Sequence, residues 1–346
     1  MSTAPRLFHP NSNALVKKHL SRTLYDQLGK LKTATGFTIE KAVASGTANI
    51  DSSIGIYAGD SETYTLFDPV FTPIIMAYHG LSAPPAISPA HKDGFDPINL
   101  PLLDPENRFI RSTRIRVARC IANMPFPPNM NIEQRLKVET LATQAAASLT
   151  GDLAGTYTAF STLPPGVYDT LCAQKLAFPK GDRFQDAAGI NADFPVGRGI
   201  YRSANQNFQI WVNEEDHLRI MALSQNSDIA GVFNRLARGL KGLCRHLEFA
   251  FDPSLGFLTA CPTNIGTAMR AGVHICLEKL EKRQHLLKDI VSRHHLQIRG
   301  TSGEKTAVDN AIFDISNARR LGVSANDIVS DLHEGLKAVI QTEQSL

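Results

Sequence analysis

Six prolines fall within residues 82–105, and they divide the chain into two unlike parts. Proline fixes φ and removes a backbone donor, so neither a helix nor a central strand can run through this stretch. With 346 residues, the chain also exceeds the usual size of one hydrophobic core. We therefore expect a smaller domain over residues 1–95 and a larger domain over residues 96–346, joined by a proline-rich linker.

The two parts also differ in the spacing of their apolar residues. Before the linker, apolar residues recur at helical spacing over residues 16–31, behind the cap-forming Asn11-Ser12-Asn13, which predicts a helix starting at Asn13. After it, residues 109–117 and 208–212 alternate as half-buried strands do, and helical patterns occupy 132–149, 229–243 and, behind Ser324, 328–339. These patterns do not alternate regularly enough for βαβ units, so we predict an α+β fold.

Composition argues against several classes of protein. The net charge of +3 comes from 36 basic and 33 acidic residues without long runs of one sign, which does not fit a nucleic-acid binder. No window approaches the ~18 apolar residues of a membrane span, and the N-terminus does not resemble a signal peptide. The five scattered cysteines form no CxxC pair and favour a reducing compartment, so we expect a cytoplasmic protein.

Arginines are the candidate anion-binding groups, because the chain has neither a GxxxxGK[ST] loop nor a GxGxxG loop. Arg114 and Arg116 alternate on one face of an expected strand, and they must point together at solvent or at a shared anion. A guanidinium presents a planar fork that matches phosphate oxygens. Taken singly, each arginine of the chain is typical of a solvated surface.

Two further segments carry reactive side chains. Cys261 ends an apolar run and precedes a polar turn, where exposed N–H groups and hydroxyls can stabilise a thiolate, although a buried inert cysteine is the commoner case. Residues 214–216 are three acidic residues in a row, which fit a solvated loop better than a metal site.

Together these segments resemble the phosphagen kinase family, and among its members the arginine kinases. The motifs that carry the resemblance stand in family order: STRIR at 112–116, GRGI at 197–200, WVNEEDHLR at 211–219, CPTNIGT at 261–267 and RGTSGE at 299–304. The resemblance implies a small all-helical N-terminal domain and a larger domain in which helices flank an antiparallel sheet. The active site would lie between them.

The resemblance also implies roles for individual residues. The residues expected to bind ATP or ADP are Arg114, Arg116, Arg219, Arg270, Arg299 and His274. Mg²⁺ would be bound through the phosphates and water, so no protein metal site is expected. Those expected to grip the guanidinium are Glu215, Glu304 and Cys261, which join Arg219, Arg270 and Arg299 as the catalytic group. Which glutamate takes the released proton stays open.

Substrate choice in this family depends on an N-terminal loop, here residues 51–57. Ser52, Ser53, Ile54 and Tyr57 match the loop of arginine kinases, which implies reversible transfer of the γ-phosphoryl group of Mg·ATP to L-arginine for energy buffering. Taurocyamine or another guanidino compound is the alternative substrate, because Ser53 stands where arginine kinases usually carry glycine. An inactive nucleotide-binding protein is a further alternative, and the chain is expected to be a monomer or a homodimer.

Overall fold

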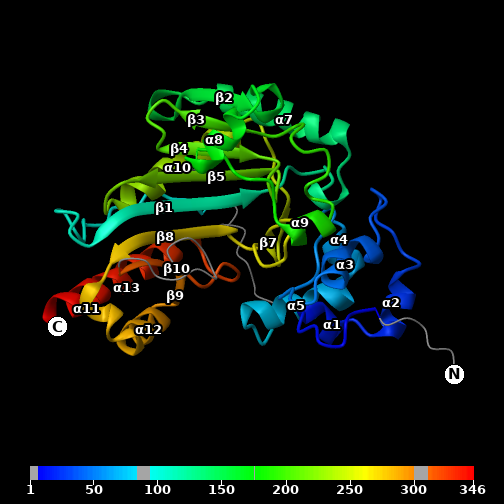
Figure 1. Cartoon of the computed structure of the whole chain (residues 1–346), viewed down its shortest axis with the longest axis horizontal. Coiled ribbons are helices and arrows are strands. Elements are labelled where there is room, and N and C mark those ends of the chain that lie inside the picture. The colour runs from blue at the N-terminus through cyan, green and yellow to red at the C-terminus, as the bar shows by residue number, and fades with distance from the viewer. Residues whose placement is uncertain (1–6, 84–93, 175, 300–310) are drawn as a thin grey trace.

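The computed structural model describes residues 7–83, 94–174, 176–299 and 311–346 (Figure 1). Its N-terminal part is helical, with α1 (Leu15–His19), α2 (Arg22–Leu28), α3 (Ile39–Ala48), α4 (Thr63–Leu66) and α5 (Asp68–His79). The single helix expected from Asn13 is wrong: it is broken at Leu20, whose backbone is extended, and Ser21 caps α2 by accepting the Leu24 N–H. A side-chain cap satisfies a helix N-terminus locally and so permits this break.

The larger part contains an eight-stranded sheet in the order β2-β3-β4-β5-β1-β8-β10-β9, with every neighbouring pair antiparallel. Its strands are β1 (Ile110–Arg119), β2 (Gly155–Ala159), β3 (Gly199–Ser203), β4 (Phe208–Val212), β5 (Leu218–Ser224), β8 (Met269–Cys276), β9 (Leu296–Arg299) and β10 (Ile312–Asn317). A separate ribbon pairs β6 (Phe251–Asp252) with β7 (Gly256–Phe257). The predicted α+β class is confirmed, as are the strands expected at 109–117 and 208–212.

The helices of the larger part are α7 (Ile132–Ala147), α8 (Val167–Ala173), α9 (Arg183–Ala187), α10 (Ile229–Leu243), α11 (Glu278–Glu281), α12 (Gln284–Arg293) and α13 (Ala325–Ser345). The three helices expected from periodicity are α7, α10 and α13. Asn131 and Ser324 each form a capping box at the start of α7 and α13, as helix N-termini require. Helices α10 and α13 contact the sheet and each other, and they cover one of its faces (Figure 1).

The two faces of β1 have opposite character. Ile115 and Val117 are fully buried in the core beneath α10 and α13, and burial of each such side chain contributes roughly 1.5–3 kcal/mol. Ser112, Arg114 and Arg116 alternate with them and point to the other face, which is more accessible. This second face positions the candidate site.

The N-terminal helices pack around their own apolar cluster. That cluster includes Phe37 and Phe71, and it extends to Leu258, Ala260 and Cys261 of the larger part. The two parts are thus in direct contact at the segment that carries Cys261. The boundary between residues 95 and 96 stays a prediction.

Within the described residues, no helix is both long and apolar enough to cross a lipid bilayer.

Candidate functional site

Four arginines share the accessible face of the sheet. Arg116 of β1 lies opposite Arg270 of β8, and Arg219 of β5 lies opposite Ala118, two residues along β1. Directly opposite residues and residues two apart on a strand point to the same face. We call these residues, Arg114, Arg116, Arg219 and Arg270, the sheet arginines.

Two adjoining hollows lie on this face, and Arg116 and Arg270 line both. The residues lining the first are Ser112, Arg114, Arg116, Arg270, Gly272, Val273, His274 and Asp314. Those lining the second are Arg116, Val117, Ala118, Arg219, Asn264, Ala268, Arg270 and Arg320. The face is therefore an indented, strongly basic surface.

Like charges are crowded on this surface. Desolvation, followed by the guanidinium groups of Arg219 and Arg270, lowers the pKa of Arg114. The pKa of Arg116 is lowered further, by burial and then by Arg219 and Arg114. Arginine still keeps its proton at neutral pH, so an anion bound here would relieve the repulsion.

Carboxylates and one aromatic ring hold three of the sheet arginines in place, namely Arg114, Arg219 and Arg270. Arg219 Nη2 lies 2.8 Å from Glu214 Oε2 and 3.6 Å from Glu215 Oε2. Arg270 donates from Nη2 to Asp314 Oδ2 at 2.6 Å. The Trp211 ring lies under the guanidinium groups of Arg114 and Arg219, at 5.7 and 5.4 Å. The guanidinium forks are thus oriented before any ligand arrives.

Two further expected residues lie near Asp314. Arg299 of β9 is opposite Asp314 in the register, and His274 Nε2 lies 3.9 Å from Asp314 Oδ2 on a half-exposed side chain. Glu304 lies outside the described residues.

Glu215 lies between the sheet arginines and the turn that follows Cys261. Its Oε2 accepts a hydrogen bond of 3.4 Å from Asn264 Nδ2. Burial, followed by the charges of Asp216 and Glu214, raises the pKa of Glu215 above the usual glutamate range. A cation placed beside Glu215 would favour its ionised form, so this position suits a positively charged ligand.

Cys261 is buried, and its Sγ lies 3.1 Å from the Thr263 hydroxyl. Burial, followed by the charge of Glu215, raises the pKa of Cys261 to about 12. Burial thus favours the neutral thiol in the chain without ligand, and a cation beside Cys261 would favour the thiolate. Tyr57 is also buried, and its pKa is raised by burial and then by Cys261 and Glu215.

The N-terminal loop is held through its carbonyl groups. The Ser53 and Ile54 carbonyls accept the N–H groups of Leu15 and Val16 at 3.0 and 3.1 Å, and Ser52 N donates to Asn49 O at 3.2 Å. Among the described residues, the Ser53 and Ile54 N–H groups donate to no protein acceptor. Such groups can receive a carboxylate.

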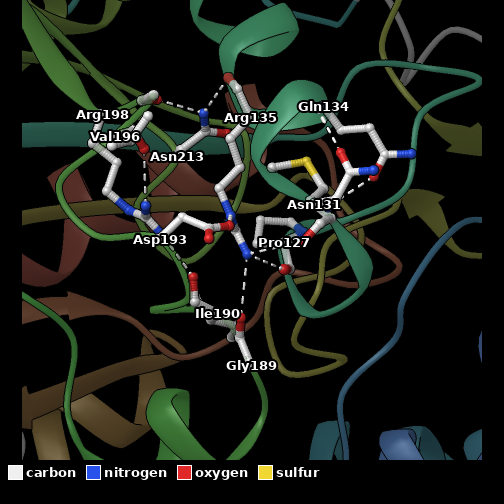
Figure 2. Close-up of polar contacts among 12 residues, drawn as sticks. Pro127, Asn131, Gln134, Arg135, Gly189, Ile190, Asp193, Val196, Arg198 and Asn213 are labelled. Atoms are coloured by element: carbon white, nitrogen blue, oxygen red, sulfur yellow. Dashed lines mark hydrogen bonds and ion pairs between the residues drawn. The ribbon is translucent and has the colours of Figure 1, made fainter.

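A buried network fixes the start of the Glu214–Glu215 turn (Figure 2). Asn213 has a positive φ of 55° and donates from Nδ2 to the carbonyls of Arg135 and Gly197, at 3.0 and 2.7 Å. Beside Asp216, His217 receives the Ile121 N–H at Nδ1 and donates to the Pro125 carbonyl, and burial lowers its pKa to about 4. Both side chains are structural supports for the acidic residues between them.

Asp314 and Arg320 were not expected from the sequence. Asp314 lies in the alternating stretch of β10, but only the pairing of β10 with β8 reveals that it meets Arg270. Arg320 donates to the Thr263 carbonyl at 3.2 Å and lines the second hollow. In the sequence, the adjacent basic pair Arg319-Arg320 is the feature that could have indicated an anion-binding role for Arg320.

In the parts of the chain that the structure describes, no group of three or more His, Cys, Asp or Glu side chains is arranged to hold a metal ion. The sheet arginines suit a polyphosphate, which can bring its own Mg²⁺.

Family models match both parts of the chain. Residues 10–76 match the N-terminal domain of ATP:guanido phosphotransferases, and residues 137–346 match their C-terminal catalytic domain. Arginine kinase of Anthopleura japonica is 41% identical over 96% of this chain, which spans 47% of that protein's length. Arginine kinase of Penaeus monodon is 39% identical, with 96% of this chain and 93% of that protein covered.

Solved structures of similar fold include kinases named for different compounds. A lombricine kinase structure has a TM-score of 0.89 and 35% identity, with 97% of this chain and 93% of that chain covered. The duplicated taurocyamine kinase of Schistosoma mansoni, with transition state analog components bound, has a TM-score of 0.89 and 30% identity. The match covers 97% of the present chain and 47% of the taurocyamine kinase chain.

Proposed function

The chain belongs to the ATP:guanido phosphotransferase, or phosphagen kinase, family, and from this premise we propose that it transfers the γ-phosphoryl group of Mg·ATP reversibly to the guanidine of L-arginine. The products are phosphoarginine and ADP. The observation that carries the proposal is the convergence of the sheet arginines with Glu215 and Cys261 at one end of the accessible sheet face.

The sheet arginines, with Arg299 and His274, hold the nucleotide in this proposal. Phosphoryl transfer spreads negative charge over the equatorial oxygens, and guanidinium groups fixed in advance neutralise it without reorganising. Mg²⁺ enters with the nucleotide and neutralises part of the same charge. Carboxylate partners at Glu214 and Asp314 supply the orientation.

Glu215, Cys261 and Glu304 hold the guanidinium. Holding the attacking nitrogen in line with the γ-phosphorus converts a bimolecular encounter into an oriented one. As the P–N bond forms, the bond from the γ-phosphorus to the bridging oxygen breaks and ADP leaves. The nitrogen loses one proton, and either glutamate can take it.

L-Arginine is favoured as the substrate by the curated relatives and by the N-terminal loop. Relatives named arginine kinase are about 40% identical over nearly the whole chain. The Ser53 and Ile54 N–H groups can receive an α-carboxylate, with Ser52 and Tyr57 bordering the same site. Taurocyamine is the second candidate, since the similar solved structures include a taurocyamine kinase, and its sulfonate suits the same N–H groups.

A coupled assay of ADP formation with L-arginine, taurocyamine, lombricine, creatine and glycocyamine tests the proposal. We expect kcat/KM for L-arginine to exceed that for creatine by at least ~10²-fold, because creatine leaves hydrogen-bonding groups in the site unpaired. A higher kcat/KM for taurocyamine would replace the substrate and keep the mechanism. ATP binding without turnover on any member of the panel would support an inactive nucleotide-binding protein.

A further inference from the structure

The segment that carries Cys261 is held from outside the sheet by the N-terminal helical domain. Tyr64 of α4 is buried and donates from its hydroxyl to the Thr259 carbonyl at 2.7 Å. His79, at the end of α5, lies with Nε2 3.0 Å from the Pro262 carbonyl. A carbonyl only accepts, so His79 Nε2 carries the hydrogen and donates.

A third contact lies between these two. Ala58, which directly follows Tyr57, donates its N–H to the Ala260 carbonyl at 2.7 Å. The carbonyls on both sides of Cys261 are therefore bound by the N-terminal domain. On the sheet side, Asp216 Oδ1 accepts the Ala260 N–H at 2.6 Å, which gives this short segment support from both parts of the chain.

We propose that Tyr64 and His79 are positioning residues for the Cys261 thiol, so that the N-terminal domain sets the geometry of the guanidinium site in addition to selecting the substrate. The catalytic part of this inference rests on the proposed function. The positional part does not, because it concerns the thiol in the chain without ligand.

The physical reason is that no regular element holds the Cys261 segment. Strand β7 ends at Phe257 and β8 begins at Met269, so residues 258–268 depend on individual hydrogen bonds for their position. Segments with few backbone ladders open locally at low free energy. Loss of the bonds at Thr259 and Pro262 should loosen the backbone on both sides of the thiol, where only the two bonds at Ala260, from Ala58 and to Asp216, then remain from the contacts described above.

Four variants test the proposal: Tyr64→Phe, His79→Ala, His79→Gln and the double variant Tyr64→Phe/His79→Ala. Tyr64→Phe keeps the ring and removes the hydroxyl, and His79→Gln keeps an N–H donor near the Nε2 position. Tyr157→Phe is the matched control, since it removes a 2.7 Å hydroxyl bond to Glu139 away from the site.

The first readout is the rate of iodoacetamide labelling at each cysteine in the chain without ligand, measured by peptide mass spectrometry. We expect the double variant to label Cys261 at least ~5-fold faster than the unaltered chain, with His79→Gln near the unaltered rate. Amide hydrogen exchange in β1 and β5 reports general unfolding and should keep its rate. An unchanged labelling rate at Cys261, or an equal acceleration of amide exchange in β1 and β5, would overturn the proposal.

The second readout is kinetic. We expect the double variant to lose at least ~10-fold in kcat while KM for Mg·ATP stays unchanged, because the guanidinium site and not the nucleotide site is disturbed. Normal kcat with faster Cys261 labelling would overturn the catalytic part. If no guanidino compound is phosphorylated, the proposed function fails, and the labelling experiment still decides the positional part.

Discussion

The four sheet arginines lie in surroundings unlike those of two other arginines, Arg135 and Arg198. Arg135 and Arg198 are almost completely buried, and backbone carbonyls accept most of their hydrogen bonds (Figure 2). The sheet arginines line hollows and repel one another, and carboxylates orient two of them, Arg219 and Arg270. Burial with backbone carbonyls as the main partners builds structure, whereas crowded cations beside a hollow prepare a surface for an anion.

The largest expected effect is a loss of turnover on substitution of a sheet arginine, and it tests whether these arginines serve catalysis and not stability. Arg270→Lys removes a planar fork and leaves a point charge, so we expect kcat to fall by ~10²–10³-fold with little change in the free energy of unfolding. Steady-state kinetics and urea unfolding of the same preparation measure both. Near-normal turnover would remove Arg270 from the transition-state contacts.

The second prediction concerns the buried pair. Arg198→Met removes the donors to the Val196 and Ile190 carbonyls, at 3.1 and 2.7 Å, and leaves buried acceptors unpaired. We expect the free energy of unfolding to fall by about 2–4 kcal/mol, while kcat of the folded fraction stays within about threefold. A large loss of kcat at unchanged stability would place Arg198 with the sheet arginines.

The third prediction uses the raised pKa of Glu215. The folded chain binds this proton more tightly than the unfolded chain, whose glutamates ionise near pH ~4.3, so stability falls as pH rises above that value. Glu215→Gln removes this loss. We expect it to raise the free energy of unfolding by at least ~1 kcal/mol at pH 8 and to leave it unchanged at pH 4.

Urea unfolding at both pH values checks this sign, and turnover of Glu215→Gln should fall strongly. Glu106→Gln is the control for the substitution itself, because Glu106 is exposed beside Arg108. Destabilisation of Glu215→Gln at pH 8 would mean that the carboxylate is favoured by its surroundings.

The smallest effect is expected at an exposed arginine that belongs neither to the sheet arginines nor to the buried pair. Arg293 pairs with Asp289 on α12, and both side chains are 67% exposed. We expect Arg293→Lys to change the free energy of unfolding by less than about 0.5 kcal/mol and kcat by less than about twofold. A larger change in kcat would mean that charge anywhere on the surface affects turnover.

Local patterns in the sequence determined much of this fold. Asn131 and Ser324 start helices where cap chemistry predicts them, and Arg114 and Arg116 share a strand face because side chains alternate. The motifs also identified the family. These features depend on residues close together in the chain, which is why one sequence is enough to find them.

Only the tertiary structure decided what those residues meet. Asp314 faces Arg270, Arg320 joins the second hollow, and Tyr64 and His79 reach the carbonyls beside Cys261. The burial of Cys261 beside Glu215, which raises the pKa of the thiol, is likewise a result of packing. Each of these contacts joins segments that are distant in the chain, so it follows from strand order and domain packing, which no local pattern encodes.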